Sequence, residues 1–288
     1  MMKTIKNLLM VSLTGIAIVF TISSCQKGFD PKTYAPSKPL PTFGGYSSSS
    51  QIETGSLVAY WPFNGNLKDS ISGISGVSTG TSFTAGTAGQ ALQGAVNGYV
   101  ITNAPPAVKA LHSFTVTTWY KMPENTNGIV NLVDVVNNQY FWGNLDMFIE
   151  NPPSATSGNL KVHLFDNGGS SSGSDLWAGD YVITSAFNQW NQIAVTYNDA
   201  TSTAIIYYNG TPVGMQTSTG FAPLNWSGVT QMVFGTVQFE TNPSLTSATG
   251  SQPWANYLTG AMDHVRIYST VLSASEASAL YNLEKLGR

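Results

Sequence analysis

The stretch "GAMDHVRIY", residues 260–268, carries a carboxylate within a pattern that is typical of a β-strand. Side chains alternate between the two faces of a strand, so this pattern predicts that Asp263 shares a face with Val265 and Ile267. A buried carboxylate without a partner is costly. We therefore expect another segment of the chain, or a bound ion, to satisfy Asp263.

Aromatic rings set among polar side chains are the second chemical feature, in "NNQYFWGN" (137–144) and "SDLWAGDY" (174–181). Sugars present C–H faces that stack on rings and hydroxyls that pair with Asn, Asp and Gln, a mixture typical of ligand sites. The alternative is that these large rings are buried in the core. The candidate ligand-binding residues are Tyr140, Trp142, Trp177, Tyr181 and Trp254.

Other chemistries find little support in the sequence. His112, His163 and His264 are spread along the chain without the spacing of metal ligands, and no G-x-S-x-G turn or glycine-rich phosphate loop occurs. A net charge of −3 without clusters of Lys and Arg argues against a nucleic-acid partner. We expect no catalytic residues and no enzymatic activity.

Short strand-like runs separated by turn signals must position these residues, and only one helix is expected. Many strands with little helix indicate an all-β sandwich. The helix is predicted at the C-terminus, where Ser273 and Glu276 form a capping box before an apolar period. The predicted strands are 57–64, 112–122, 128–136, 144–150, 160–166, 190–198, 204–209, 231–235 and 260–268.

Four segments resemble the LamG-like jelly-roll domains of the concanavalin A-like superfamily: "LVAYWPFNGNLKDSISG" (57–73), "SFTVTTWYKM" (113–122), "WNQIAVTYNDATSTAIIYYNGTPVG" (190–214) and "GAMDHVRIYSTVLSASEASALYN" (260–282). They stand in the order of the family and span nearly all of the chain beyond residue 56. The resemblance implies a concanavalin A-like jelly-roll β-sandwich with a short C-terminal helix.

The resemblance also implies a partner for Asp263. Many members of the family hold a structural calcium ion where the first and last strands meet, and the matching side chains here are Asn64, Asp69 and Asp263. Calcium takes six to eight oxygen ligands, so backbone carbonyls would supply the rest. The alternative is that backbone N–H groups of the 64–70 loop donate hydrogen bonds to Asp263 and no metal binds.

The superfamily includes β-glucanases, whose active-site strand has the pattern E-x-D-x-E. Residues 144–148 keep only the central acid, Asp146, because Asn144 and Phe148 replace the two glutamates. The next acid on the same face, Glu150, would stand about 13 Å from Asp146 along an extended strand. Paired carboxylates of glycosidases lie about 5–9.5 Å apart, so a glycoside hydrolase is the less favoured interpretation.

The N-terminus predicts a bacterial lipoprotein. Lys3 and Lys6 precede an uncharged apolar run that ends in Ile22-Ser23-Ser24-Cys25, which resembles a lipobox. Cys25 is the only cysteine in the chain, and lipid attachment would explain its presence. The predicted divisions are a signal peptide at 1–24, the lipidated Cys25 with a Pro- and Ser-rich tether at 25–55, and a LamG-like domain at 56–288.

Together these features predict a non-catalytic lipoprotein that captures a polysaccharide or oligosaccharide at the cell surface. It would be held in the bacterial envelope, at the outer membrane, by its lipid anchor alone. Two alternatives remain open: a protein-binding or adhesive module with a surface protein as its partner, and a structural protein of the envelope.

Overall fold

A computed structural model describes residues 39–221 and 223–288, apart from the side chains at positions 152 and 153. One compact unit runs from Pro41 to Arg288. The predicted signal peptide, Cys25 and the tether as far as residue 38 lie outside the described residues. Within the part of the chain that is described, no helix is long and apolar enough to cross a membrane.

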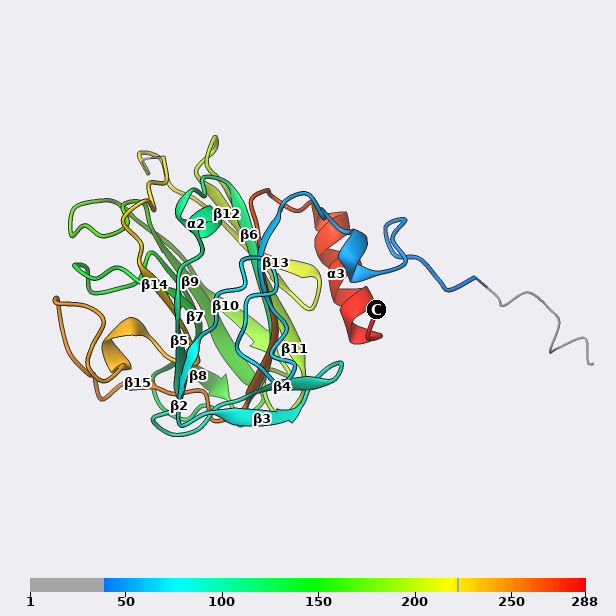
Figure 1. Cartoon of the computed structure of the whole chain (residues 1–288). Helices are drawn as coiled ribbons and strands as arrows, with labels where there is room; N and C mark the ends of the chain where they lie inside the picture. Colours follow the sequence, from blue (N-terminus) through cyan, green and yellow to red (C-terminus); the bar gives the residue numbers. More distant parts are fainter. Residues whose placement is uncertain (1–38, 222) are drawn as a thin grey trace, which may run out of the picture. The chain divides into compact units, whose positions relative to one another are not determined.

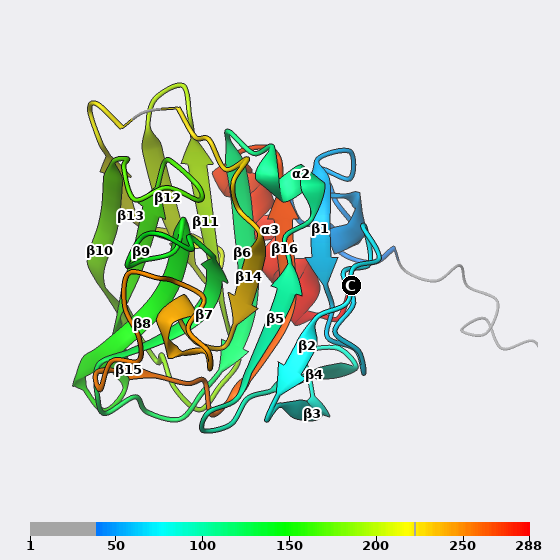
Figure 2. The ribbon, with the colours of Figure 1, turned by 60° about the vertical axis from the view of Figure 1, so that its left-hand side comes forward.

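The fold consists of two eight-stranded sheets packed face to face (Figure 1, Figure 2). The first sheet has the strand order β13-β12-β11-β6-β16-β4-β3, with β1 also paired to β16. Its strands are β1 (Leu57–Trp61), β3 (Ser82–Ala85), β4 (Gln90–Gln93), β6 (Phe114–Lys121), β11 (Asn191–Asn198), β12 (Thr203–Tyr208), β13 (Thr211–Thr217) and β16 (Ala261–Tyr268).

The second sheet has the order β10-β9-β8-β7-β14-β5-β2, and the short β15 pairs with β7. Its strands are β2 (Val77–Thr79), β5 (Tyr99–Asn103), β7 (Ile129–Val135), β8 (Leu145–Ser154), β9 (Ser157–Phe165), β10 (Asp175–Thr184), β14 (Gln231–Phe234) and β15 (Ala255–Asn256). The helices are η1 (Ser49–Gln51), α2 (Pro106–Lys109), η2 (Gln238–Glu240) and α3 (Ala274–Lys285). The predicted all-β sandwich with a short C-terminal helix is confirmed.

The hydrophobic core fills the space between the inner faces of the two sheets. Alternation along β6 places Val116 and Tyr120 in this core, and alternation along β8 places Met147 there. Phe234 of β14 meets Trp61 of β1 edge-on, with ring centroids 5.0 Å apart. Aromatic rings from both sheets therefore pack against each other in the core.

Helix α3 covers the outer face of the first sheet, which explains why β6 is buried on both sides. The predicted capping box is present, since Ser273 accepts from the backbone of Glu276 and Glu276 accepts in return. In the last turn of the helix, the buried Glu284 accepts hydrogen bonds from three strands of the sheet. Its donors are Trp119 Nε1 (2.7 Å), Gln192 Nε2 (2.8 Å) and Arg266 Nε (2.6 Å).

The chain joins the domain earlier than predicted. The tether was expected to run to residue 55, but Phe43, Tyr46 and Ile52 pack against the apolar residues of α3. Tyr46 also donates a hydrogen bond to Glu276, and Arg288 donates to the carbonyl oxygens of Pro41 and Ser47. These three apolar side chains follow no regular period, so the sequence pattern did not reveal that they are buried together.

Candidate functional site

The outer face of the second sheet gathers most of the predicted ligand-binding residues. Leu145, Met147 and Ile149 of β8 point into the core, so Asp146 and Phe148 between them point outward. The same alternation brings His163 of β9 to the outer face. Figure 2 looks onto this sheet, with α3 behind the other one.

Four of the five predicted aromatic residues meet here and form what we call the aromatic platform: Tyr140, Trp142, Trp177 and Trp254. Trp142 lies at its centre, with ring centroids 5.3 Å from Trp177 and 5.8 Å from Trp254. Tyr140 stacks on Phe165 of β9 at 4.1 Å. Trp177 is 41% exposed, whereas the other three rings are half-buried. Trp177 is thus the most exposed ring of the platform, and it packs against the half-buried ring of Trp142.

Tyr181, the fifth predicted residue, does not join the platform. A β-bulge between Ala178 and Tyr181 of β10 shifts the register against β9. Trp177 pairs with the outward His163, but Tyr181 pairs with the core residue Leu160 and packs against the core. The bulge turns Tyr181 to the opposite face from Trp177, which a strict alternation could not anticipate.

A row of acidic and imidazole side chains runs across the sheet beneath the platform. His163 is fully buried, and its Nδ1 lies 3.0 Å from Asp146 Oδ2 while its Nε2 lies 2.5 Å from Asp175 Oδ1. Asp175 Oδ2 accepts a hydrogen bond of 2.9 Å from the hydroxyl of Tyr140. At the buried end, Asp134 pairs across the strands with Asp146 and accepts from the backbone of Gln238. We call these residues the acidic row.

The two ends of the acidic row differ in charge. Burial raises the pKa of Asp134 well above its ordinary value, and the neighbouring Asp146 raises it further. The Oδ1 atoms of Asp134 and Asp146 are both buried without a hydrogen-bond partner among the described residues. Burial opposes charge on His163, but its hydrogen bonds to Asp146 and Asp175 raise the pKa of His163.

The exposed end of the row is an ionised carboxylate. Burial alone would raise the pKa of Asp175, but the hydrogen bonds from His163 and Tyr140 lower it. Those bonds fix Asp175 beside the exposed ring of Trp177, whose centroid lies 4.3 Å from that of His163. Sequence reasoning named the segment but not this residue. The signal was available, because Asp175 stands two residues before Trp177 and so shares its face.

The β8 strand shows no glucanase-like carboxylate pair. Asp146 is fully buried against His163, and Glu150 forms an ion pair with Lys161 of β9 at 2.9 Å. Asp146 and Glu150, which the sequence predicts to be far apart, thus also have different partners, His163 and Lys161. The exposed side of the arrangement is an aromatic face beside a hydrogen-bond acceptor, Asp175, that is held in place.

A β-bulge in β16 also corrects the prediction for Asp263. Between the pairs Asp263–Trp119 and Arg266–Thr117, two residues of β16 stand opposite one residue of β6. His264 takes a left-handed conformation at φ +48°. Met262, Val265 and Ile267 therefore face the core, and the prediction that Asp263 shares a face with Val265 and Ile267 is wrong.

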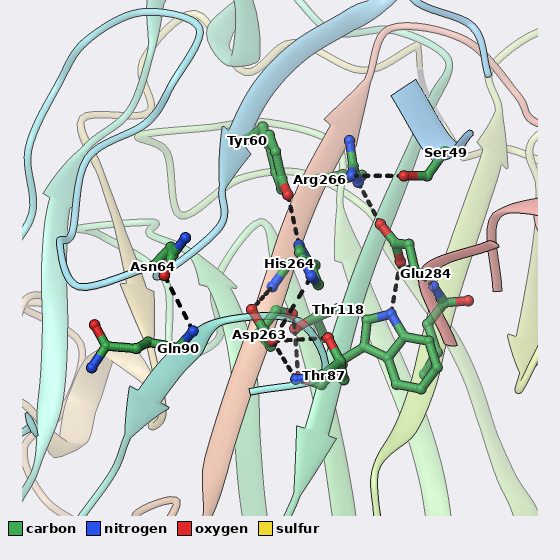
Figure 3. Close-up of polar contacts among 12 residues, drawn as sticks. Ser49, Tyr60, Asn64, Thr87, Gln90, Thr118, Asp263, His264, Arg266 and Glu284 are labelled. Carbon is green, nitrogen blue, oxygen red and sulfur yellow. Dashed lines mark hydrogen bonds and ion pairs between the residues drawn. The ribbon is translucent and has the colours of Figure 1, made fainter. Parts of the chain in front are cut away.

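Asp263 is satisfied by hydrogen bonds (Figure 3). Its Oδ2 accepts from the backbone N–H and the hydroxyl of Thr87, both at 2.9 Å, and its Oδ1 accepts from the backbone of His264. Burial raises the pKa of Asp263, although the nearby His264 and the bonds from Thr87 oppose the shift. The N–H donor from another segment is thus on the β3–β4 turn, not on the 64–70 loop.

The other two predicted calcium ligands also accept hydrogen bonds. Asn64 Oδ1 accepts from the backbone of Gln90 at 3.2 Å, and Asp69 Oδ1 accepts from the backbone of Tyr60 at 2.7 Å. Among the described residues, no group of three or more His, Cys, Asp or Glu side chains could hold a metal ion. A calcium ion would compete with these N–H donors for the same oxygens, and calcium binding stays a prediction.

Comparison with known proteins decides the family. The sequence profile of the concanavalin A-like lectin/glucanase superfamily matches residues 93–278, which is more than half of the chain. The chain belongs to this superfamily. No curated protein matches the chain closely enough to be counted as a relative.

Solved structures with the same fold share little sequence with this superfamily member. The binding domain of Paraclostridial mosquitocidal protein 1 has a TM-score of 0.57 and 17% identity, over 79% of this chain and 52% of that one. The binding domain of botulinum neurotoxin DC, in complex with SialylT, has a TM-score of 0.57 and 14% identity, over 81% and 52%. The chain thus spans about half the length of these toxin domains.

A third structure is matched over nearly its whole length. Domain 4 of AbnA, a GH43 extracellular arabinanase from Geobacillus stearothermophilus, in complex with arabinotriose, has a TM-score of 0.50 and 19% identity. The match covers 78% of this chain and 98% of that domain. At these identities the likeness establishes the fold, and two of these three structures are binding domains.

Proposed function

We propose that this protein is a non-catalytic carbohydrate-binding module whose sugar stacks on Trp177 and donates hydroxyl hydrogen bonds to Asp175. The observation that carries the proposal is the pairing of an exposed indole ring with a carboxylate that His163 and Tyr140 hold in place. Sugar recognition needs an apolar face and a fixed polar acceptor together. The structures in complex with SialylT and arabinotriose support the same class of ligand.

The lipobox extends this proposal to the cell envelope. Lipidation of Cys25 would hold the module at the outer membrane of a bacterium, facing the outside. The chain enters the domain at Pro41 beside α3, and α3 covers the first sheet. The aromatic platform lies on the outer face of the second sheet, so it would point away from the point of attachment.

The test is titration of the purified protein with a panel of neutral and acidic oligosaccharides by calorimetry. Trp177→Ala and Asp175→Asn should each weaken binding by about tenfold or more, because each removes a main contact with the sugar, and tenfold corresponds to about 1.4 kcal/mol. Met215→Ala is the matched control, since it removes a large exposed side chain from the first sheet, 65% exposed against 41% for Trp177. Binding that is unchanged in both variants would refute the proposal.

The protein-binding alternative makes a different forecast in the same experiment. A protein partner would use the exposed Trp177 and Val182 of β10 as an apolar contact, without need of the Asp175 carboxylate. No oligosaccharide would then bind, and Asp175→Asn would leave capture of the partner unchanged. The carbohydrate proposal requires the opposite result for both measurements.

A further inference from the structure

We propose a second sugar-binding subsite, for a neutral sugar residue, in a cavity on the other side of the 236–257 loop from the aromatic platform. The proposal rests on the proposed carbohydrate-binding function for the class of its ligand. The cavity has a volume of about 550 Å³, enough for one or two sugar rings, and we call it the tyrosine cavity. Its lining includes Thr79, Asn97, Tyr99, Glu240, Ser251 and Tyr257.

Two tyrosine rings supply the apolar surface. Tyr99 of β5 and Tyr257 after β15 stack with centroids 6.4 Å apart. Their hydroxyls are engaged with backbone groups: Tyr257 donates to the carbonyl of Glu240 at 2.7 Å, and Tyr99 accepts from the backbone of Asn242 at 3.0 Å. The rings are thus fixed before any ligand arrives, which lowers the entropy that binding must overcome.

A buried carboxylate supplies the polar recognition. Glu240 is 4% exposed, and its oxygens accept one hydrogen bond each, from the backbone of Gln252 and from the hydroxyl of Ser251 (2.8 Å). A carboxylate oxygen can accept two hydrogen bonds, so each retains capacity for a sugar hydroxyl. Among the described residues that line the cavity, Glu240 alone is charged, and an anionic sugar would therefore be repelled.

Two further polar side chains, Thr79 and Asn97, border the cavity, and both are exposed to solvent. The same loop supplies Trp254 to the platform and Tyr257 to the cavity. An extended oligosaccharide lying over the outer face of the second sheet could therefore contact both.

The chain offers a clean way to fill the tyrosine cavity. Gly250 lines it, and a Cβ added there would meet nothing within 4 Å. Gly55 has the same open surroundings but stands before β1, at the first sheet. Gly250→Trp therefore adds a large ring at the lining of the cavity without a clash at its Cβ, and Gly55→Trp is the matched control. Thr79→Val removes one lining hydroxyl and keeps the branched shape of the side chain.

The experiment titrates the full chain in detergent with arabinotriose, cellohexaose, mannohexaose and an oligogalacturonate. We expect a neutral probe to bind, Gly250→Trp to weaken it by about tenfold or more, Thr79→Val to weaken it by a smaller factor, and Gly55→Trp to leave it unchanged. Wild-type affinity in Gly250→Trp would overturn the subsite, as would an oligogalacturonate that binds as tightly as the neutral probes and is lost in Gly250→Trp.

Trp177→Ala separates this inference from the proposed function. Loss of binding in Trp177→Ala with wild-type binding in Gly250→Trp would keep the platform and refute the cavity. The reverse pattern would keep the cavity and refute the platform. No binding of any probe by the wild type would refute both.

Discussion

Replacement of His163 by Leu tests the acidic row most directly. The side chain is fully buried and forms hydrogen bonds to two carboxylates, at 3.0 Å to Asp146 and 2.5 Å to Asp175. Leu has a similar size but donates nothing, so Asp146 would stay buried without its counter-charge. Removing one partner of a buried ion pair costs about 3–5 kcal/mol of unfolding free energy.

The measurement is thermal and urea unfolding, followed by circular dichroism. For a domain of this size 1 kcal/mol shifts the melting temperature by about 2–4 °C, so we expect His163→Leu to melt about 6–20 °C below the wild type. His112→Leu is the control, because its side chain is 68% exposed and lies 3.7 Å from Asp199. Its stability should stay within about 0.5 kcal/mol of the wild type.

The stability difference between wild type and His163→Leu should also depend on pH, in a direction that the pKa of His163 sets. The pKa of His163 is raised in the folded protein, so its contribution is complete below the unfolded value of about 6.5 and is lost as pH rises through the folded value. The difference in stability between wild type and His163→Leu should therefore shrink from pH 6 to pH 9. A variant within about 1 kcal/mol of wild type, or a gap that widens with pH, would refute this account of the row.

Three other perturbations test the remaining features. Asp263→Ala should lower the melting temperature, because it removes the acceptor for the hydrogen bonds from Thr87. If a chelator lowers the melting temperature of the wild type and added calcium restores it, a calcium ion is bound. If the melting temperature does not respond, hydrogen bonds are all that hold Asp263. Cys25→Ala should move the protein from the membrane to the soluble fraction of the cells, and retention as firm as that of the wild type would contradict lipid anchoring. Glu284→Ala should cost about 3–5 kcal/mol in a urea melt because it leaves Arg266 buried without its partner, whereas a Lys285→Ala change one residue along should cost almost nothing.

Sequence reasoning succeeded where patterns are long and uninterrupted. The two-sheet sandwich and the capped C-terminal helix follow from alternation and capping, whereas the gathering of Trp142 with Trp177 and Trp254 is visible only in the structure. The predicted strands omitted β2, β3, β4, β5, β10, β13 and β15. β2, β3 and β4 have four residues or fewer, and β2 and β3 are largely exposed. β10 and β13 are longer, but they lie at sheet edges and carry several exposed side chains, which weakens their hydrophobic pattern.

The errors at the site have one cause, the β-bulge. One extra residue in β16 turned Asp263 away from Val265, and the bulge in β10 turned Tyr181 away from Trp177. A bulge cannot be read from the amino-acid composition of a strand. Beyond it, each side chain points to the opposite face from the one that strict alternation predicts. The acidic row escaped prediction for a different reason, because its members lie on four strands and meet only through their pairing.

The attachment of residues 41–52 to α3 determines how the domain would bear tension. A polymer held on the second sheet and an anchor that pulls through Pro41 would load the sandwich across its full thickness, from one outer face to the other. The first contacts under strain would be the bonds from Arg288 to Pro41 and Ser47 and the bond from Tyr46 to Glu276. Once these bonds and the packing of Phe43, Tyr46 and Ile52 on α3 were broken, residues 41–52 would extend while both sheets stayed intact, so this segment would yield to force before the domain unfolds.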